Sequence, residues 1–175
     1  MSEMDFLMAL QNLHNPFLDA LMVGATWLGN AGIIWILTGV VLLCIPKHRF
    51  CGIRIGAALI LCLLVGCVIV KPIVARDRPC WVDPTVQMLV RVPKDYSFPS
   101  GHTMSSFSCA TVLFNYKKKW GIIALVLAVL IAFSRMYLFV HYPTDVLAGL
   151  AIGVIMSALC DYLLRYIYRK KHSTV

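Results

Sequence analysis

The stretch IRIGAALILCLLVGCVIVKPIVA, residues 53–75, decides the fold class of this chain. It is 23 residues long and carries only two charged side chains, Arg54 near its start and Lys71 near its end. A helix needs roughly 20 apolar residues to cross the hydrocarbon core of a bilayer. The stretch therefore predicts a transmembrane helix with a basic residue toward each membrane surface.

Five further apolar stretches predict membrane-spanning helices, and two or three of the six are short. They cover residues 17–28, 31–45, 103–116, 120–137 and 144–168. The first two are separated only by Gly29-Asn30, so a single bent helix is an alternative for that pair. Residues 1–15 contain Glu3 and Asp5 without a basic leader, which is typical of a short interfacial helix rather than a cleaved signal peptide. We expect one all-α domain over residues 1–175, a six-helix transmembrane bundle with a short N-terminal interfacial helix.

Composition supports an integral membrane protein. The mean hydropathy is +0.80, and 14% of residues are charged, against about 25% in soluble domains. The formal net charge of +8 could suggest a nucleic-acid partner, but the placement of the basic residues argues for a membrane instead. The seven cysteines include no CxxC pair, so neither a zinc site nor a redox site is expected.

Basic residues predict the orientation, because loops rich in Lys and Arg tend to stay in the cytoplasm. With six crossings, ten of the sixteen lie on one side together with both termini: Lys47, Arg49, Arg54, Lys117, Lys118, Lys119, Arg165, Arg169, Lys170 and Lys171. We therefore expect a multi-pass protein of the plasma (inner) membrane with cytoplasmic N- and C-termini. The other six lie on the extracytoplasmic side and need another explanation: Lys71, Arg76, Arg78, Arg91, Lys94 and Arg135.

Three polar stretches, far apart in the sequence, meet at this outer side. Lys71 and Arg78 flank the end of one span, Ser100-Gly101-His102 opens the next, and Arg135, His141 and Asp145 stand between the last two. Ionisable residues at membrane depth are costly and indicate function. The basic side chains only donate hydrogen bonds, which favours an anion with several oxygens. The helix start at Ser100-Gly101 exposes unpaired N–H groups that suit the same ligand.

Each of these residues also has a structural alternative. The basic side chains can reach the lipid headgroups, Ser100 can be a plain N-cap, and Asp145 can offset a helix dipole. Two histidines beside one phosphate nevertheless suggest a nucleophile and a proton donor. Asp145 follows His141 by four residues, with Pro143 suited to a first helical turn, so its carboxylate is expected to orient that imidazole. Spacing alone leaves open which histidine attacks.

Taken together, these residues resemble the signature of the type 2 phosphatidic acid phosphatase superfamily. The pattern is Lys71-x6-Arg78-Pro79, then Pro99-Ser100-Gly101-His102, then Ser134-Arg135-x5-His141-x3-Asp145. The resemblance implies a lipid phosphatase that needs no metal or other cofactor and has a core of six transmembrane helices. It also implies these roles: His141 forms a phosphohistidine, Asp145 orients it, His102 protonates the leaving group and later activates water, and Lys71, Arg78, Ser100, Gly101 and Arg135 hold the phosphate.

The substrate expected from this resemblance is undecaprenyl pyrophosphate, with phosphatidylglycerol phosphate and phosphatidic acid as alternatives. Arg91 and Lys94 can contact a second phosphate or simply face solvent. Three other classes compete with a phosphatase. A related haloperoxidase is disfavoured because those enzymes are generally soluble, and an anionic-lipid transporter or channel does not explain paired histidines with an orienting carboxylate. A structural membrane scaffold gives no reason for the outer charges. The sequence contains no signal for the oligomeric state.

Overall fold

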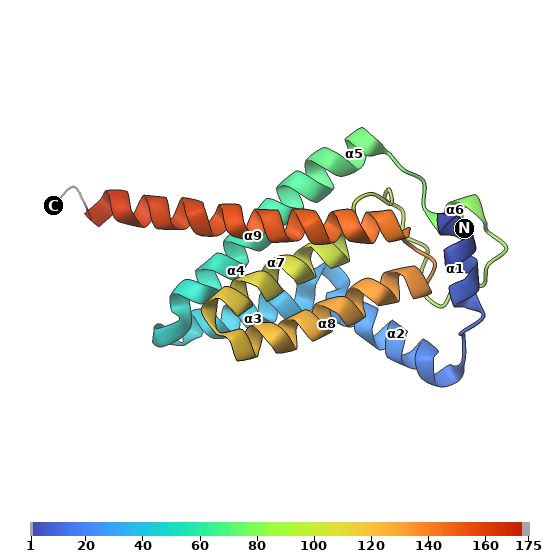
Figure 1. Cartoon of the computed structure of the whole chain (residues 1–175), viewed down its shortest axis with the longest axis horizontal. Helices are drawn as coiled ribbons and strands as arrows, with labels where there is room; N and C mark the ends of the chain where they lie inside the picture. Colours follow the sequence, from blue (N-terminus) through green and yellow to red (C-terminus); the bar gives the residue numbers. More distant parts are fainter. Residues whose placement is uncertain (1, 173–175) are drawn as a thin grey trace.

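The computed structural model describes residues 2–172, and every regular element in that range is helical (Figure 1). The elements are α1 (Glu3–Gln11), α2 (Pro16–Gly29), the 3-10 turn η1 (Asn30–Gly32), α3 (Ile33–Cys44), the 3-10 turn η2 (Pro46–His48), α4 (Arg49–Cys62), the π-helical segment η3 (Leu63–Val70), α5 (Lys71–Val74), α6 (Pro79–Val82), α7 (Gly101–Tyr116), α8 (Lys118–Tyr137) and α9 (Pro143–His172). Each expected span lies within a few residues of an observed helix or run of helices. The predicted all-α fold is confirmed.

Helices α2 and α3 form a single bent pass rather than two crossings. Near the start of α2, Asp19 accepts a hydrogen bond from Tyr137 Oη (2.6 Å), at the C-terminal end of α8. In α3, Trp35 Nε1 donates to Ser106 Oγ (2.9 Å), in the second turn of α7. Figure 1 shows α2 and α3 following one another from one end of the molecule to the other. They bend at η1, where Ala31 has a φ of 50°.

The path of the chain differs from the sequence prediction. Four stretches are long and apolar enough to cross a membrane, namely Pro16–Cys44, Pro46–Val82, Lys118–Tyr137 and Pro143–Leu164. With the 16-residue α7 this gives five passes along the bundle, where six crossings were predicted. In this arrangement α1 and the far end of α9 lie at opposite ends of the bundle (Figure 1). The charge count could not reveal this difference, because no Lys or Arg precedes Lys47.

The expected N-terminal helix is present and packs against the bundle. Ser2 caps α1, and its hydroxyl accepts from Asp5 N while its own N–H donates to the Asp5 carboxylate. Leu7 and Leu10 are buried in a cluster with Tyr137, at the end of α8. Burial of these two leucines holds α1 over the same end of the bundle as the connections before α7 and α9.

A small-residue seam joins α7 to α9. Gly149 and Gly153 stand four residues apart on α9, and a Cβ atom there would lie 2.7 Å from Ser100 O and 2.4 Å from Met104 O. Small residues at this spacing let two membrane helices approach closely. At the end of the seam, Ser100 N donates to the backbone oxygen of Asp145 (3.1 Å). The starts of α7 and α9 are thereby fixed to each other.

The segments η3 and α5 pack more loosely against the bundle than α4, which precedes them. Gly66 is the only buried residue of η3, and Lys71 is the only one of α5. A π-helical turn is wider than an α-helical turn and often occurs beside functional sites. In this chain the π-helical segment directly precedes Lys71, whose ammonium group points to the interior rather than to lipid.

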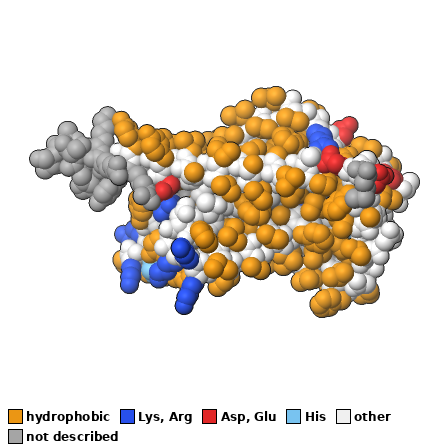
Figure 2. Space-filling view, viewed as in Figure 1, with side chains coloured by type: hydrophobic (Ala, Val, Ile, Leu, Met, Phe, Trp, Pro, Cys, Tyr) orange, Lys and Arg blue, Asp and Glu red, His pale blue; other side chains and the backbone are white. Residues whose placement is uncertain are grey.

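The molecular surface has the pattern expected of a membrane protein. Figure 2 shows hydrophobic side chains covering the middle of the visible face, with most Lys and Arg at the end where α3 meets α4 and α7 meets α8. Most acidic side chains on this face lie at the opposite end, near α1. The large exposed apolar residues include Trp27, Ile123 and Val126, which are 62%, 70% and 67% exposed. Such a continuous apolar surface matches a lipid environment rather than water.

Candidate active site

His141 and Asp145 form a buried pair between α8 and α9. His141 lies in the connecting loop and Asp145 in the first turn of α9, with His141 Nδ1 3.5 Å from Asp145 Oδ2. Ser97 Oγ donates to the same carboxylate oxygen (2.5 Å) and lies 3.4 Å from His141 Nδ1. The backbone N–H of Tyr142 also donates to it (2.9 Å). The carboxylate thus lies on the Nδ1 side of the imidazole and is held there by three contacts.

The other ring nitrogen of His141 faces Arg78. Arg78 Nη1 donates to Val140 O (2.7 Å) and lies 3.1 Å from His141 Nε2. Because a guanidinium can only donate, Nε2 must be unprotonated, and the ring proton belongs on Nδ1, toward Asp145. Burial lowers the pKa of His141 below its ordinary value, which keeps the ring neutral. His141 therefore has an unprotonated Nε2, as a nucleophile requires.

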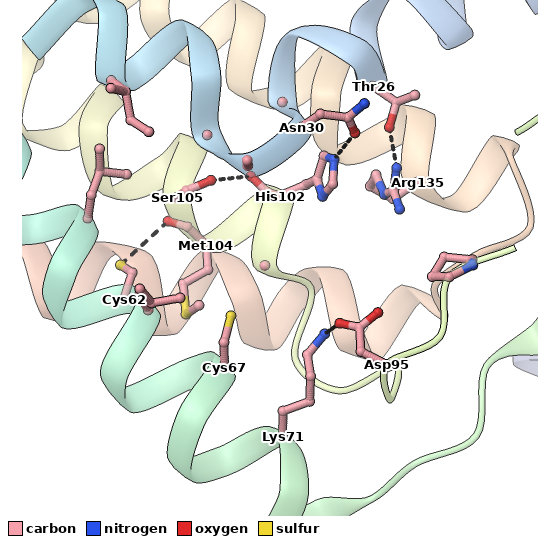
Figure 3. Close-up of a pocket in the computed structure, with 18 of the residues that line it drawn as sticks. Thr26, Asn30, Cys62, Cys67, Lys71, Asp95, His102, Met104, Ser105 and Arg135 are labelled. Atoms are coloured by element: carbon pink, nitrogen blue, oxygen red, sulfur yellow. Dashed lines mark hydrogen bonds and ion pairs between the residues drawn. The ribbon is translucent and has the colours of Figure 1, made fainter. Parts of the chain in front are cut away.

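His102 has a different environment. It stands in the first turn of α7, and its Nε2 lies 3.0 Å from Asn30 Oδ1 in the η1 bend (Figure 3). Gly29 lies against the ring, since a Cβ atom there would come within 2.7 Å of it. The partner of this imidazole is a neutral amide instead of a carboxylate. The two histidines are therefore placed for different tasks.

Three buried cations border the same space. Lys71 and Arg78 both bind the Asp95 carboxylate, with Arg78 Nη2 donating to Oδ1 (2.8 Å) and Lys71 Nζ pairing with Oδ2 (Figure 3). Arg135 is 5% exposed and donates to Thr26 Oγ1, but its Nε is buried with no hydrogen-bond partner among residues 2–172. A buried charged donor without a partner is costly. An anion bound in this space would remove that cost.

One cavity of about 1110 Å³ connects these groups. At one end it is lined by six of the eight predicted site residues: Lys71, Arg78, Gly101, His102, Arg135 and His141. Away from them the lining is apolar and comes from α3 and α4, with Ile36, Val40 and Leu43 facing Ile55, Leu59 and Ile60. The cavity thus joins a cationic, histidine-bearing end to an apolar groove between two membrane helices.

This architecture matches a known family. A model described as the PAP2 superfamily matches residues 52–169, well over half of the chain. The chain belongs to the PAP2 superfamily. It is a multi-pass membrane lipid phosphatase of a metal-independent family, which confirms the resemblance found in the sequence.

PAP2 relatives with several substrates are similar to this chain. An undecaprenyl-diphosphatase of Sulfolobus acidocaldarius is 35% identical over 81% of this chain and 68% of its own length. A decaprenylphosphoryl-5-phosphoribose phosphatase of Mycobacterium tuberculosis is 29% identical over 91% of this chain and 89% of its own. The crystal structure of a PAP2 phosphatidylglycerolphosphate phosphatase from Bacillus subtilis superposes with a TM-score of 0.77 at 27% identity, covering 94% of this chain and 85% of that one. Similarity alone therefore does not select one lipid.

Two of the predicted PAP2 site residues lie behind the cavity wall rather than on it. Asp145 is fully buried and reaches the cavity through His141. Ser100 is also fully buried and is the N-cap of α7, where its Oγ accepts from Thr103 N (3.4 Å) and Thr103 Oγ1 (2.9 Å). The N-cap alternative therefore describes the Ser100 side chain in this structure. Its neighbour Gly101 lines the cavity at the start of the helix.

Sequence reasoning missed four polar residues of this PAP2 site: Asn30, Arg76, Asp95 and Ser97. Arg76 Nη1 donates to Asp145 Oδ1 (2.7 Å), and its Nη2 donates to Glu3 Oε2 (2.6 Å), which links α1 to the buried pair. Asp95 and Ser97 directly precede the Phe98–His102 motif, and that closeness in sequence was the available signal. Asn30 stood inside the break Gly29-Asn30, which was interpreted only as an interruption of the helix.

Proposed function

We propose that this protein hydrolyses a lipid diphosphate at the extracytoplasmic membrane surface, with undecaprenyl pyrophosphate as its substrate and undecaprenyl phosphate as its lipid product. The observation that carries the proposal is the single cavity. Both histidines and three cations line one end of it, and the apolar groove between α3 and α4 forms the other. A phosphate at the cationic end would leave a long hydrocarbon chain lying along the groove.

The chemistry follows from the two histidine environments. His141 Nε2 attacks the terminal phosphorus, the bond from that phosphorus to the bridging oxygen breaks, and His102 gives that oxygen a proton. The enzyme then carries a phosphohistidine. His102, which began as an imidazolium and is now neutral, takes a proton from water. The water oxygen attacks phosphorus, the bond from phosphorus to His141 Nε2 breaks, and inorganic phosphate is released. Asp145 stabilises the positive charge that His141 acquires, and Lys71, Arg78 and Arg135 stabilise the phosphoryl oxygens.

Two features favour a long-chain diphosphate among the lipids that the relatives' names suggest. The cavity volume of about 1110 Å³ is above the range of ordinary small-molecule sites, about 300–1,000 Å³, which leaves room for part of a long hydrocarbon chain beside the phosphate. Arg91 and Lys94 also line the cavity, beyond the first three cations, where they would meet a second phosphate.

A lipid panel tests the substrate. Purified enzyme in detergent is given undecaprenyl pyrophosphate, phosphatidylglycerol phosphate, phosphatidic acid or decaprenylphosphoryl-5-phosphoribose, and kcat/KM is measured from phosphate release in chelator. We expect the highest value for the diphosphate. A higher kcat/KM for any other lipid in the panel would overturn the substrate assignment, but the protein would still be a lipid phosphatase.

The phosphohistidine is tested separately. After a brief mixing with diphosphate lipid labelled in its terminal phosphate, acid-labile and base-stable label is expected on wild-type protein and none on His141→Ala. The variant His102→Ala retains His141, so it should accumulate label if the leaving phosphate departs without proton donation, or show none if that step needs the acid. Label on His141→Ala would assign the attack to another residue.

The membrane orientation is part of the proposal. Basic residues gather at the end opposite the site (Figure 2), so we place that end in the cytoplasm and the site outside. Helix α1 is then extracytoplasmic, and α9 ends in the cytoplasm. An epitope tag added before Ser2 should be digested by protease in intact spheroplasts, and a tag after Val175 should be digested only after lysis. The reverse pattern would invert the orientation.

A further inference from the structure

We propose that Asp95 is a specificity-determining residue, which holds the phosphate position in the empty enzyme and admits only ligands with more than one negative charge. This inference rests on the proposed function, because it concerns the phosphate end of the same cavity. It explains how a lipid phosphatase avoids the singly charged phosphodiester lipids that surround it.

The first step is the placement of the carboxylate. Asp95 bridges two cations that are themselves buried, since the side chains of Lys71 and Arg78 are 9% and 3% exposed. The Asp95 side chain is 57% exposed and belongs to the connection before α7, so it can leave without disturbing a helix. Its two oxygens occupy the donors that would otherwise bind phosphate oxygens, as Figure 3 shows for Lys71.

The second step concerns charge. Burial of the carboxylate opposes its ionisation, but the ion pairs with Lys71 and Arg78 prevail and lower the pKa of Asp95 to about 2. The group is therefore an anion at every physiological pH. It supplies a counter-charge for cations that would be costly to leave unpaired.

The third step compares the possible replacements. A phosphodiester carries one negative charge, so exchanging it for Asp95 brings no additional charge to the cations. A phosphomonoester or a terminal diphosphate carries more than one charge near pH 7, as a phosphoryl group with a second pKa of about 6 does. Only the second kind of ligand increases the attraction to the cations when it displaces the carboxylate. Asp95 thereby favours ligands with more than one negative charge over phosphodiesters.

Arg78 remains in place when Asp95 is released or neutralised. Its Nε donates to the backbone oxygen of Asp95 (2.6 Å), and its Nη1 donates to Val140 O (2.7 Å). Neither contact involves the carboxylate. The substitution Asp95→Asn therefore removes the competing charge while it preserves the position of the guanidinium.

The test compares wild type, Asp95→Asn and a matched control, Asp77→Asn. Asp77 is exposed and lies between Arg76 and Arg78, so its neutralisation changes the charge near the site by the same amount. Full-length proteins in neutral detergent micelles are assayed for inhibition of diphosphate hydrolysis by phosphatidylglycerol. Binding of inorganic phosphate and of glycerophosphoglycerol is measured by calorimetry, which requires no turnover.

We expect Asp95→Asn to bind phosphatidylglycerol and glycerophosphoglycerol about 10-fold to 100-fold more tightly than wild type, the size of one hydrogen bond to a charged group. The affinity of Asp77→Asn for these phosphodiesters should differ from that of wild type by less than twofold. Asp95→Glu, which keeps the negative charge, should bind them as weakly as wild type does. If Asp95→Asn and Asp77→Asn gained phosphodiester affinity equally, the effect would come from the overall charge near the site, and the proposal would be overturned. So would unchanged phosphodiester binding by Asp95→Asn.

Folding is controlled within the same experiment. Inorganic phosphate should raise the melting temperature of Asp95→Asn more than that of wild type, because the variant lacks its internal counter-charge. If Asp95→Asn and Asp95→Ser both fail to fold even with phosphate present, Asp95 is a structural counterion and the proposal is wrong. Absence of lipid hydrolysis by wild type would refute the proposed function instead, while the calorimetric comparison would still decide the role of Asp95.

Discussion

The substitution Gly153→Ala should reduce catalysis without touching any polar residue of the site. A Cβ atom at this position would lie 2.4 Å from Met104 O and 3.1 Å from Ser108 N, whereas ordinary contacts of a Cβ atom are 3.4–4 Å. The nearest atoms belong to the backbone of α7, so they cannot move as a flexible side chain does. Helices α7 and α9 must therefore separate by roughly 1 Å to reach ordinary contact.

That separation acts on the two histidines from different sides. His102 belongs to α7, and the His141–Asp145 pair is fixed at the start of α9. A misplacement of about 1 Å between reacting groups can cost about 100-fold in rate, equivalent to roughly 2.7 kcal/mol in the activation free energy. We expect this loss in kcat for diphosphate hydrolysis, measured well below the melting temperature. Calorimetric affinity for inorganic phosphate should change much less, because Lys71 and Arg78 lie outside the seam.

Gly24→Ala is the matched control, because a Cβ atom on Gly24 in α2 meets nothing within 4 Å. Replacing an exposed helical glycine by alanine stabilises a helix by up to about 1 kcal/mol, so this variant should be fully active and slightly more stable. If Gly153→Ala kept a kcat within twofold of wild type, the close approach of α7 and α9 would not position the histidines. The reasoning would then be refuted.

Four further predictions concern the reacting residues. His141→Ala should be inert to lipid diphosphate but remain folded by thermal melting; residual turnover above background would contradict its role as nucleophile. Asp145→Asn should lower kcat by about 10²–10⁴-fold with little change in KM, because the imidazole loses its anionic partner; full activity would remove the orienting role. Asn30→Ala should lower kcat about tenfold through loss of one hydrogen bond to His102, and an effect confined to KM would argue against this positioning. Finally, His141 must be neutral to attack, so activity is present above its pKa and is lost as pH falls through that pKa. Because burial lowers the pKa of His141, the acid limb of the kcat/KM profile should lie below pH 6.5. An acid limb above pH 6.5 would contradict a buried neutral ring.

The structure brings the three motif segments together, whereas it departs from the predicted path of the first two spans. The three motif segments have fixed spacings, and they meet because the connections before α7 and α9 lie at one end of the bundle. The first two spans had no comparable signal. A break such as Gly29-Asn30 suits a reversal or a bend equally well, and only the packing of α2 and α3 along α8 and α7 distinguishes these outcomes.

The site residues missed from the sequence were missed for the same reason, because their roles depend on tertiary packing. Asp95 is one of two acidic side chains in the long connection between α6 and α7, the other being Asp83, and nothing in its neighbours marks it as the partner of Lys71 and Arg78. Arg76 was noticed as an outer cation, but its pairing with Asp145 and with Glu3 depends on where α1 packs. Long-range contacts of this kind are set by tertiary structure and have no local pattern.

The unequal packing of the helices divides the cavity into a rigid wall and a compliant one. His102 and the His141–Asp145 pair belong to the rigid wall, which is held by glycine-to-backbone contact between α7 and α9. The compliant wall is η3, where Gly66 is the one buried residue and where Leu63 and Cys67 line the cavity. A lipid tail of different thickness can therefore be accommodated by displacing η3 alone, so changes in η3 can alter which lipid tail is accepted while the two histidines keep their positions.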